Sequence, residues 1–466
     1  MSIERLLATA PGRLPPGDAA YLVRLFGDYA AWVLHEEVLT KAEAVLGQPA
    51  APGPMGALLA RRTVATGLFV RDPRFPTLRE TFLLPVQWSA HPPDHASRLE
   101  RLEKMVAGML VGSDWLTRRW EKRSLKLVPV GNIHSDARDL LFESDLFQWA
   151  SAGGSLLLSA IQALYDLTDP LAGPPVLVSF CFDPQRGVQP VSHVTGKAAL
   201  ARSMGAGTIV VAESQSGEFR RCLQTAEPPV DVYPVPDGLR NLGQLLRQLS
   251  EVLLLPPADD ADPGTLADYY LLLHRIDRER ARVYYRDTLL PQIVARIRAI
   301  QEDGVRGLES RTLLTVLSKN PETTYLGIAT FRPTSCYVIE LAPDRELEQA
   351  RAWLERELGQ VVPETKLNWL QCSDLDEFLG ESEKLRSTLR DKGVQDGALI
   401  VDLTPGPKPV SFGLLFQVVG ENDYVCYLEH RWEDNLPRPF TERYRITRGQ
   451  FGASSALQNP GAVRTR

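Results

Sequence analysis

The residues of this 466-residue chain best suited to chemistry are a serine and a lysine, each at the expected start of a helix. Ser155 follows two glycines and precedes the apolar segment 156–167, and Lys197 follows Gly196 at the start of a second helical segment. A lysine that is dehydrated enough to be neutral can take the proton of a serine and make its oxygen a nucleophile. The two residues are therefore a candidate Ser-Lys dyad.

The same residue types have a structural explanation. A serine after two glycines is often an N-cap, whose hydroxyl accepts a hydrogen bond from the first turn of the helix. Most lysines are solvated surface charges. Residue type alone favours this structural explanation, so the surrounding pattern has to decide between the two.

That pattern resembles the proteolytic domain of Lon proteases over residues 55–255. The serine and the lysine are 42 residues apart, close to the separation in the family, and Pro190 precedes Lys197 by seven residues, as in the family. Segment 206–213 resembles the strand that follows the lysine helix, and 121–127 resembles the short strand before the serine loop. Gly154 stands where the family has proline, and Ser192-His193 stands where it has two glycines.

The resemblance implies a serine endopeptidase in which Ser155 is the nucleophile and Lys197 the general base. Ser179 occupies the position of the threonine that hydrogen-bonds the lysine in the family. Lon proteins proper use an ATPase to feed substrate, but 195–198 imitates only the tail of a Walker A loop. We therefore expect an ATP-independent protease that is regulated in another way.

The first part of the chain is expected to contain a helical segment, 1–54, followed by the Lon-like α+β domain. Helical spacing of apolar residues predicts one packing helix over 19–46, which ends near a break rich in proline and glycine. Further expected elements are strands 63–70 and 81–88, a helix over 99–109 and a closing helix over 238–254.

A linker and connector are expected over residues 256–310. Segment 256–264 is acidic and contains prolines, which is typical of a linker. Residues 265–302 are helical in pattern and rich in arginine, and alternating charges on a helix usually form a solvated face, so we favour that over a nucleic-acid contact. The arginines are Arg275, Arg278, Arg280, Arg282, Arg286, Arg296 and Arg298.

Strand and helix patterns alternate over residues 311–445, which predicts a doubly wound, Rossmann-like sheet, and a tail follows at 446–466. Ligands of such sheets bind at the carboxyl ends of the strands. The expected strands are 312–317, 336–341, 366–370 and 398–402, and the expected helices are 344–358 and 375–389.

The loop 402–409 follows one of these strands and precedes a helix. Thr404, Gly406 and Lys408 supply a hydroxyl, a flexible backbone and a cation, which together with a helix N-terminus are suited to hold an anion. By residue type alone, an ordinary turn with a surface lysine is the alternative and is favoured.

This loop, with its sequence DLTPGPKP, resembles the D-x-T-G-G-T-K-x-M loop of CARF domains, the CRISPR-associated Rossmann-fold sensors of cyclic oligoadenylate. Segment 313–322 resembles the first strand and loop of that family. The resemblance implies ligand contacts from Ser318, Asn320, Thr404, Gly406 and Lys408. It also implies a homodimer and a cyclic oligoadenylate ligand, with cyclic tetra-adenylate as the default.

Composition limits the function classes. A formal net charge of -6 makes a strongly basic nucleic-acid-binding protein an unlikely class, and we expect no direct DNA binding. The five cysteines are scattered without CxxC spacing, and the seven histidines lack metal-site spacing, so neither a disulfide framework nor a metal is expected. With no leader-like start and no run of 18 apolar residues, we expect a cytoplasmic protein without a membrane span.

Together these patterns predict a cyclic-oligoadenylate-activated protease that acts as an accessory effector of type III CRISPR defence on a specific protein, which could be encoded nearby. Two alternatives remain open. In one, the C-terminal domain is a ring nuclease and the Lon-like part an inactive scaffold. In the other, the protein is a sensor that acts as a transcription factor or adaptor, although the N-terminal half offers no basic groove of that kind.

Overall fold

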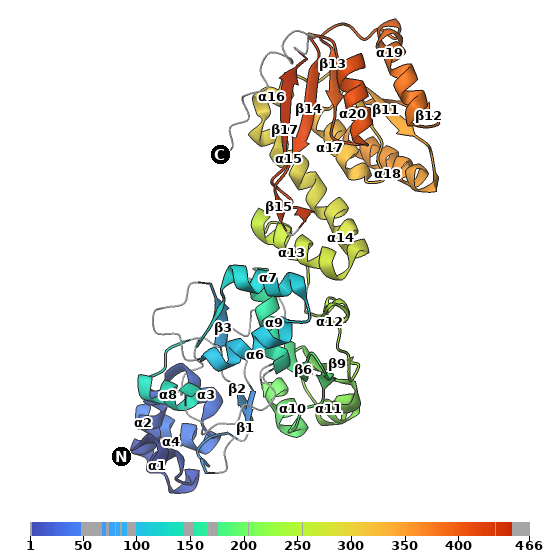
Figure 1. Ribbon diagram of the computed structural model, residues 1–466. Helices are drawn as coiled ribbons and strands as arrows, with labels where there is room; N and C mark the ends of the chain where they lie inside the picture. The colour runs from blue at the N-terminus through green and yellow to red at the C-terminus, as the bar shows by residue number, and fades with distance from the viewer. Residues whose placement is uncertain are drawn as a thin grey trace. The chain divides into compact units, whose positions relative to one another are not determined.

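The structure, a computed structural model, divides into two compact units, Met1–Arg278 and Glu279–Arg466. Each unit combines helices with parallel strands, which confirms the expected α/β class (Figure 1). None of the helices in the described ranges has the length and apolar character needed to cross a membrane. The described residues are 2–47, 68–70, 74–79, 81–83, 86–90, 99–129, 131–143, 153–165, 167, 176–203, 205–253, 255–433 and 435–449.

The domain limits expected from sequence remain predictions. Most of the predicted strand 63–70 and most of the predicted tail 446–466 lie outside the described residues.

The first unit begins with a small helical cluster, where the prediction of one helix over 19–46 is wrong. The chain instead forms α2 (Pro16–Phe26), α3 (Ala30–Val33) and α4 (Glu36–Leu46). The break falls at Gly27, whose φ of +51° is in the left-handed region. A Cβ at Gly27 would lie 2.4 Å from the carbonyl oxygen of Asn132, so this close approach of two chain segments requires glycine.

The next elements lead up to the serine helix. The helix predicted over 99–109 is confirmed, whereas the strand predicted over 81–88 is two strands with different partners. Glu121 to Arg123 belong to a helix, so only the end of the strand-like segment 121–127 is a strand. The elements are β1 (Leu68–Val70) paired with β2 (Thr81–Leu83), β3 (Val86–Ser89) paired with β4 (Lys126–Pro129), α6 (Glu100–Leu110) and α7 (Asp114–Arg123).

A three-stranded parallel sheet forms the centre of this unit, in the order β5-β8-β9. Leu177 and Ile209 of the sheet pack with Ala198 and Phe219, so two helices cover one face as a continuous apolar core. The elements are α9 (Gly153–Leu164), β5 (Val176–Ser179), β6 (Cys181–Asp183), β7 (Gly187–Gln189), α10 (Val194–Ser203), β8 (Thr208–Ala212), α11 (Ser216–Leu223), β9 (Asp231–Val235), α12 (Leu242–Leu249) and α13 (Pro263–Ile276).

The arginine-rich segment is helical as predicted, but it is interrupted at Asp277, where the backbone is extended. After the break come α14 (Arg278–Tyr284), a π-helical turn (Tyr285–Leu289) and α15 (Leu290–Ile300). The expectation of a solvated arginine face is only partly correct. Arg286 and Arg298 are largely buried, with side chains 19% and 21% exposed, and pair with Glu322 and Glu309 respectively.

The second unit contains a six-stranded sheet in the order β12-β11-β10-β13-β14-β17, in which only β17 is antiparallel. Helices cover both faces, which is the predicted doubly wound arrangement (Figure 1). The strands are β10 (Thr312–Val316), β11 (Ser335–Leu341), β12 (Lys366–Cys372), β13 (Leu399–Asp402), β14 (Tyr424–Glu429) and β17 (Arg443–Arg448), and the helices are α17 (Pro321–Phe331), α18 (Arg345–Val361), α19 (Leu375–Asp391) and α20 (Lys408–Gly413).

The order of the strands reverses between β10 and β13, which lie side by side in parallel. At such a switch point the loops that follow the two strands turn away in opposite directions and leave a crevice between them. Both loops with expected ligand contacts, the one after β10 and the one after β13, begin at this point.

Candidate active site and ligand loops

Ser155 lies in the first turn of α9 and is 2% exposed. It is the third residue of the helix, so the alternative that it serves only as the N-cap is wrong. The helix around it is fixed on all sides, since all twelve of its residues are buried. The Trp88 indole N–H donates to the hydroxyl oxygen of Ser159, one turn beyond Ser155, at 3.0 Å.

Lys197 is the fourth residue of α10 and is fully buried, so the alternative of a solvated surface lysine is wrong. Burial deprives its ammonium group of water and lowers its pKa to about 8. The turn before α10 places His193 in the left-handed region, with φ at +60°. Lon proteases have glycine in this turn, and left-handed backbone is the conformation that glycine adopts most easily.

The loop before Lys197 is also held by a side-chain amide. The Gln215 side chain accepts from the Val191 N–H at 2.8 Å and donates to the Val191 carbonyl at 2.5 Å. Val194 and Ala198, which flank Lys197 on α10, are part of the apolar core of the sheet. The position of the lysine is therefore determined by both backbone and packing.

The start of α9 lies against the segment between β5 and β6. A Cβ at Gly154 would lie 2.6 Å from the carbonyl oxygen of Phe180, and one at Gly153 would lie 3.5 Å from the Cys181 sulfur. Only glycine allows this approach of α9 to the turn. Burial raises the pKa of the Cys181 thiol, and the charge of Lys197 acts on this thiol in the opposite direction.

The structure therefore places the start of the serine helix against Phe180 and Cys181, and the charge of Lys197 reaches the Cys181 thiol. Cys181 was missed in the sequence analysis. The signal was available, because Cys181 stands two residues after Ser179, and alternate residues of an extended chain share a side.

Ser179 ends β5 and is 1% exposed. Its hydroxyl oxygen has no hydrogen-bond partner among the described residues, so the bond to Lys197 implied by the family is not formed in this structure. A buried hydroxyl without a partner costs about 1–3 kcal/mol. The Ser179 hydroxyl, which directly precedes Phe180 and Cys181, is therefore able to form a hydrogen bond that it does not form in this structure.

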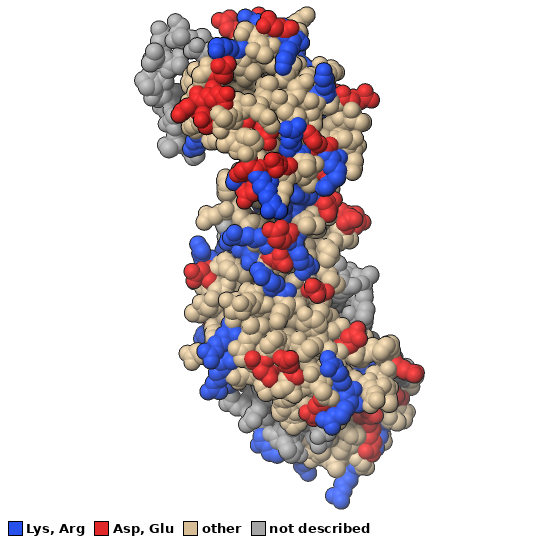
Figure 2. Space-filling view, turned by 90° about the vertical axis from the view of Figure 1, so that its right-hand side faces the viewer, with Lys and Arg blue, Asp and Glu red and all other residues tan. Residues whose placement is uncertain are grey.

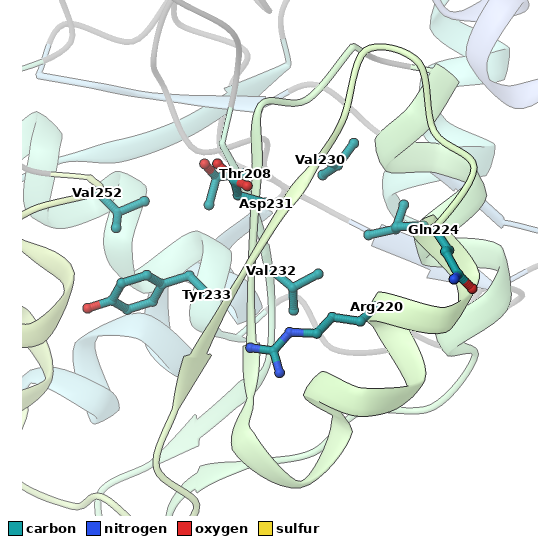
Figure 3. A pocket seen from close by; sticks show the side chains of 9 residues that line it. Thr208, Arg220, Gln224, Val230, Asp231, Val232, Tyr233 and Val252 are labelled. Atoms are coloured by element: carbon teal, nitrogen blue, oxygen red, sulfur yellow. The ribbon is translucent and has the colours of Figure 1, made fainter.

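A cavity of about 550 Å³ lies at the amino end of the same sheet. Thr208 and Asp231 begin the two strands that line it, and the Arg220 side chain extends from α11 toward Val232 (Figure 3). Ser179 ends its strand at the opposite, carboxyl edge of the sheet. This cavity is consequently separate from the candidate dyad.

In the second unit, the loop after β10 holds two of the expected ligand residues. The Ser318 hydroxyl accepts from the Asn320 N–H at 3.2 Å and donates to the Asn320 carbonyl at 2.9 Å, which closes a tight turn at the start of α17. The Asn320 side chain is exposed and makes no capping hydrogen bond to α17. Its amide is therefore accessible from solvent.

The loop after β13 holds the other three. Gly406 has a φ of +88°, and a Cβ there would lie 2.8 Å from Val316, the last residue of β10. The two loops are therefore in contact. The Thr404 hydroxyl oxygen accepts from the Leu428 N–H at 2.8 Å, whereas Lys408 is exposed at the first position of α20.

Asp402, the residue before this loop, is fully buried below α17. One carboxylate oxygen accepts from the Thr404 N–H at 2.9 Å, and the other has no partner in the part of the chain that the structure describes. Burial raises the pKa of Asp402 to about 6, against the opposing effect of the hydrogen bonds from Thr404.

Basic and acidic groups are interleaved over the face shown in Figure 2. Over the described ranges, no three side chains of the His, Cys, Asp or Glu type gather as a metal site would require.

No protein-family model matches the sequence, and no curated protein matches it significantly. The assignment of both sites therefore depends on their geometry and on the resemblance of their motifs.

Proposed function

We propose that this protein is a serine endopeptidase with a Lon-like Ser155–Lys197 dyad, controlled by a cyclic oligoadenylate that binds to its C-terminal unit. The observation that carries the proposal is the complete burial of Lys197, which lowers its pKa to about 8. A substantial fraction of such lysines is neutral near physiological pH, and only a neutral amine can accept a proton. A lysine with no chemical role has no need of such a position, because exposure would spare it the cost of desolvation.

In the proposed mechanism, Lys197 takes the hydroxyl proton of Ser155 while the serine oxygen attacks the scissile carbonyl. The resulting lysine ammonium then gives its proton to the leaving amine, and an acyl-enzyme ester remains on Ser155. Lys197 next deprotonates the water that hydrolyses this ester. Ser179, whose hydroxyl is unpartnered in the described structure, would hydrogen-bond the amine and orient it once substrate has bound.

Control is assigned to the second unit because two motif-bearing loops meet at the switch point of its sheet. Ser318 and Asn320 on one loop, and Thr404, Gly406 and Lys408 on the other, would contact the ligand, with cyclic tetra-adenylate as the expected ring. A two-fold-symmetric ring fits a homodimer. The protein would then be an accessory effector of type III CRISPR defence that cleaves a specific partner protein without an ATPase motor.

A serine-reactive phosphonate probe tests the dyad without knowledge of the substrate. We expect cyclic tetra-adenylate to increase covalent labelling of the full-length protein, with the mass increase mapping to Ser155 and absent from Ser155→Ala. The Ser214→Ala variant, altered at an exposed serine of the same unit, is the matched control and should label normally. Labelling of Ser155→Ala at the wild-type rate would contradict the dyad. Recovery of linear oligoadenylate from the same incubation would instead favour the ring nuclease.

A further inference from the structure

A cavity of about 390 Å³ lies beside the loop after β10, on the side of α14 and α18. All of its lining residues belong to the second unit. Three of them are cations, Arg282, Arg286 and Lys319, and the exposed Asn320 stands next to them. Arg282 and Arg286 lie outside the two motif segments that suggested the proposed ligand contacts, and Lys319 lies within segment 313–322 but is not one of those contacts.

The two arginines share one acid. The Nε atoms of Arg282 and Arg286 both donate to the same carboxylate oxygen of Glu322, at 3.0 and 2.7 Å. Two guanidinium groups and one carboxylate leave one positive charge in excess. Arg282 makes one further contact, from Nη2 to the Lys319 carbonyl at 3.4 Å, and no other acid among the described residues pairs with either arginine.

Arg286 is held in place as a rigid donor. Its guanidinium lies 4.2 Å from the centre of the Trp353 ring, and its side chain is 19% exposed. It stands in the π-helical turn that follows α14, and such turns are frequent at functional sites. An arginine fixed in this way loses little conformational freedom when it binds an anion.

The acids that pair with Lys319 are exposed to water and bind it weakly. Its ammonium lies 3.0 Å from a carboxylate oxygen of Asp344 and 2.5 Å from one of Glu346, and these side chains are 46% and 68% exposed. Ion pairs that are exposed to water contribute about 0–1 kcal/mol. The Glu346 carboxylate can therefore give way to a stronger anion that enters the cavity.

We infer that this cavity is a phosphate-binding site, in which Arg282, Arg286 and Lys319 hold a phosphate monoester or diester. The single acid shared by two arginines, their planar donors and the nearby N-terminus of α17 favour a tetrahedral dianion or diester, provided that the exposed acids paired with Lys319, which offset the remaining positive charge, give way to it. The phosphate can come from a separate phosphorylated ligand or from the cyclic oligoadenylate, whose proposed contact Asn320 also lines the cavity. Only that second source rests on the proposed function.

Calorimetry on the full-length protein with inorganic phosphate tests the site itself. Arg282→Gln should weaken phosphate binding about tenfold, because a charged hydrogen-bond donor is lost. Glu322→Gln should strengthen binding, because the acid that competes for both arginines is neutralised. Arg356→Gln, on α18 and paired with Glu357, is the matched control and should bind as wild type.

The opposite signs separate binding from folding, since a purely structural role of the Arg-Glu cluster would make both variants worse. Absence of phosphate binding to the wild type, or equal affinities of wild type and Arg282→Gln, would overturn the inference. A parallel titration with cyclic tetra-adenylate identifies the source. Weaker binding of the ring to Arg282→Gln assigns the phosphate to the ring, and unchanged binding assigns it to a separate ligand. If the ring does not bind at all, while phosphate binds most tightly to Glu322→Gln, less tightly to wild type and least tightly to Arg282→Gln, the sensor proposal fails and this inference stands.

Discussion

Lys197 in the first unit and Lys408 in the second both stand in the first turn of a helix, where the helix dipole disfavours a cation. Lys197 is fully buried and its pKa falls to about 8, whereas Lys408 is exposed at the first position of α20. The comparison shows that one residue type at similar helix positions can have two different environments. A buried lysine with a lowered pKa can accept and release a proton near neutral pH, and an exposed, charged lysine can bind an anion reversibly.

The rest of each region agrees with this division. Around Lys197 the helix of Ser155 is buried along its whole length. At the loop after β10 in the second unit, Lys319 pairs with acids that water reaches, such as Glu346. The proposed dyad therefore belongs to a buried region, and the proposed ligand contacts belong to a region that water reaches.

The largest effect should come from removing the buried amine. We expect Lys197→Met to lower proteolytic or probe-labelling rates at least about a thousandfold, because no general base remains. The fold should survive, because methionine fills a similar volume and needs no hydration. Lys384→Met, at a 71% exposed lysine, is the matched control and should keep wild-type rates. Retained activity in Lys197→Met would mean that Lys197 is not the general base, and the proposed difference in role between Lys197 and Lys408 would be wrong.

The pH dependence of the first unit should follow the neutral form of Lys197. Its pKa is lowered, so the amine is mostly protonated and inactive well below pH 8 and mostly neutral above it. We expect kcat/KM to rise about tenfold per pH unit below about pH 8 and then level off. A profile of labelling rate against pH checks this. A midpoint near pH 6.5, the ordinary value for histidine, would point to a different base.

The exposed lysine should produce a smaller and salt-dependent effect. Lys408→Gln is expected to weaken cyclic tetra-adenylate binding about tenfold, since it loses one charged contact with a phosphate. The difference between variant and wild type should shrink as salt rises, because exposed charges are screened. Titration calorimetry at two salt concentrations measures both. If Lys408→Gln binds with the wild-type affinity, the loop does not hold the ligand through this residue.

Local patterns in the sequence were sufficient for much of the second unit. Runs of β-branched and apolar residues predicted β10, β11 and β13 closely, and alternation with helices predicted the doubly wound sheet. The contact between Gly406 and Val316 then followed from the topology, because β10 and β13 are neighbours.

Features that depend on distant parts of the chain could not be predicted in this way. The helix expected over 19–46 breaks because Gly27 contacts Asn132, and no local pattern contains that partner. The burial of Lys197 likewise depends on several elements of the sheet and its helices. The pair of arginines at 282 and 286 was recognisable by its spacing of four, which places both on one helix face, but Glu322 was not recognisable as their shared partner.

The smallest expected effect concerns Asp402, the buried acid at the start of loop 402–409. It is the buried ionisable group of the second unit that we compare with Lys197 of the first. Its pKa of about 6 exceeds the ordinary 3.8, so the folded state binds the proton more tightly than the unfolded state. The resulting stability is present below about pH 4 and is lost as pH rises through 6. Asp402→Asn, which keeps an oxygen acceptor for the Thr404 N–H, should therefore be more stable than wild type at pH 8, by up to about 3 kcal/mol, and similar to it at pH 4.

Urea unfolding of the second unit at the two pH values measures this difference, with the exposed Asp391→Asn as the matched control. Equal stabilities of Asp402→Asn and wild type at pH 8 would mean that water reaches the carboxylate. In that case water would reach loop 402–409 at its buried end, at Asp402, as well as at its exposed residues. A gain in the free energy of unfolding that is confined to high pH would instead show that water does not reach the Asp402 carboxylate. The second unit would then differ from the first in how it uses the buried group, and not in whether it has one.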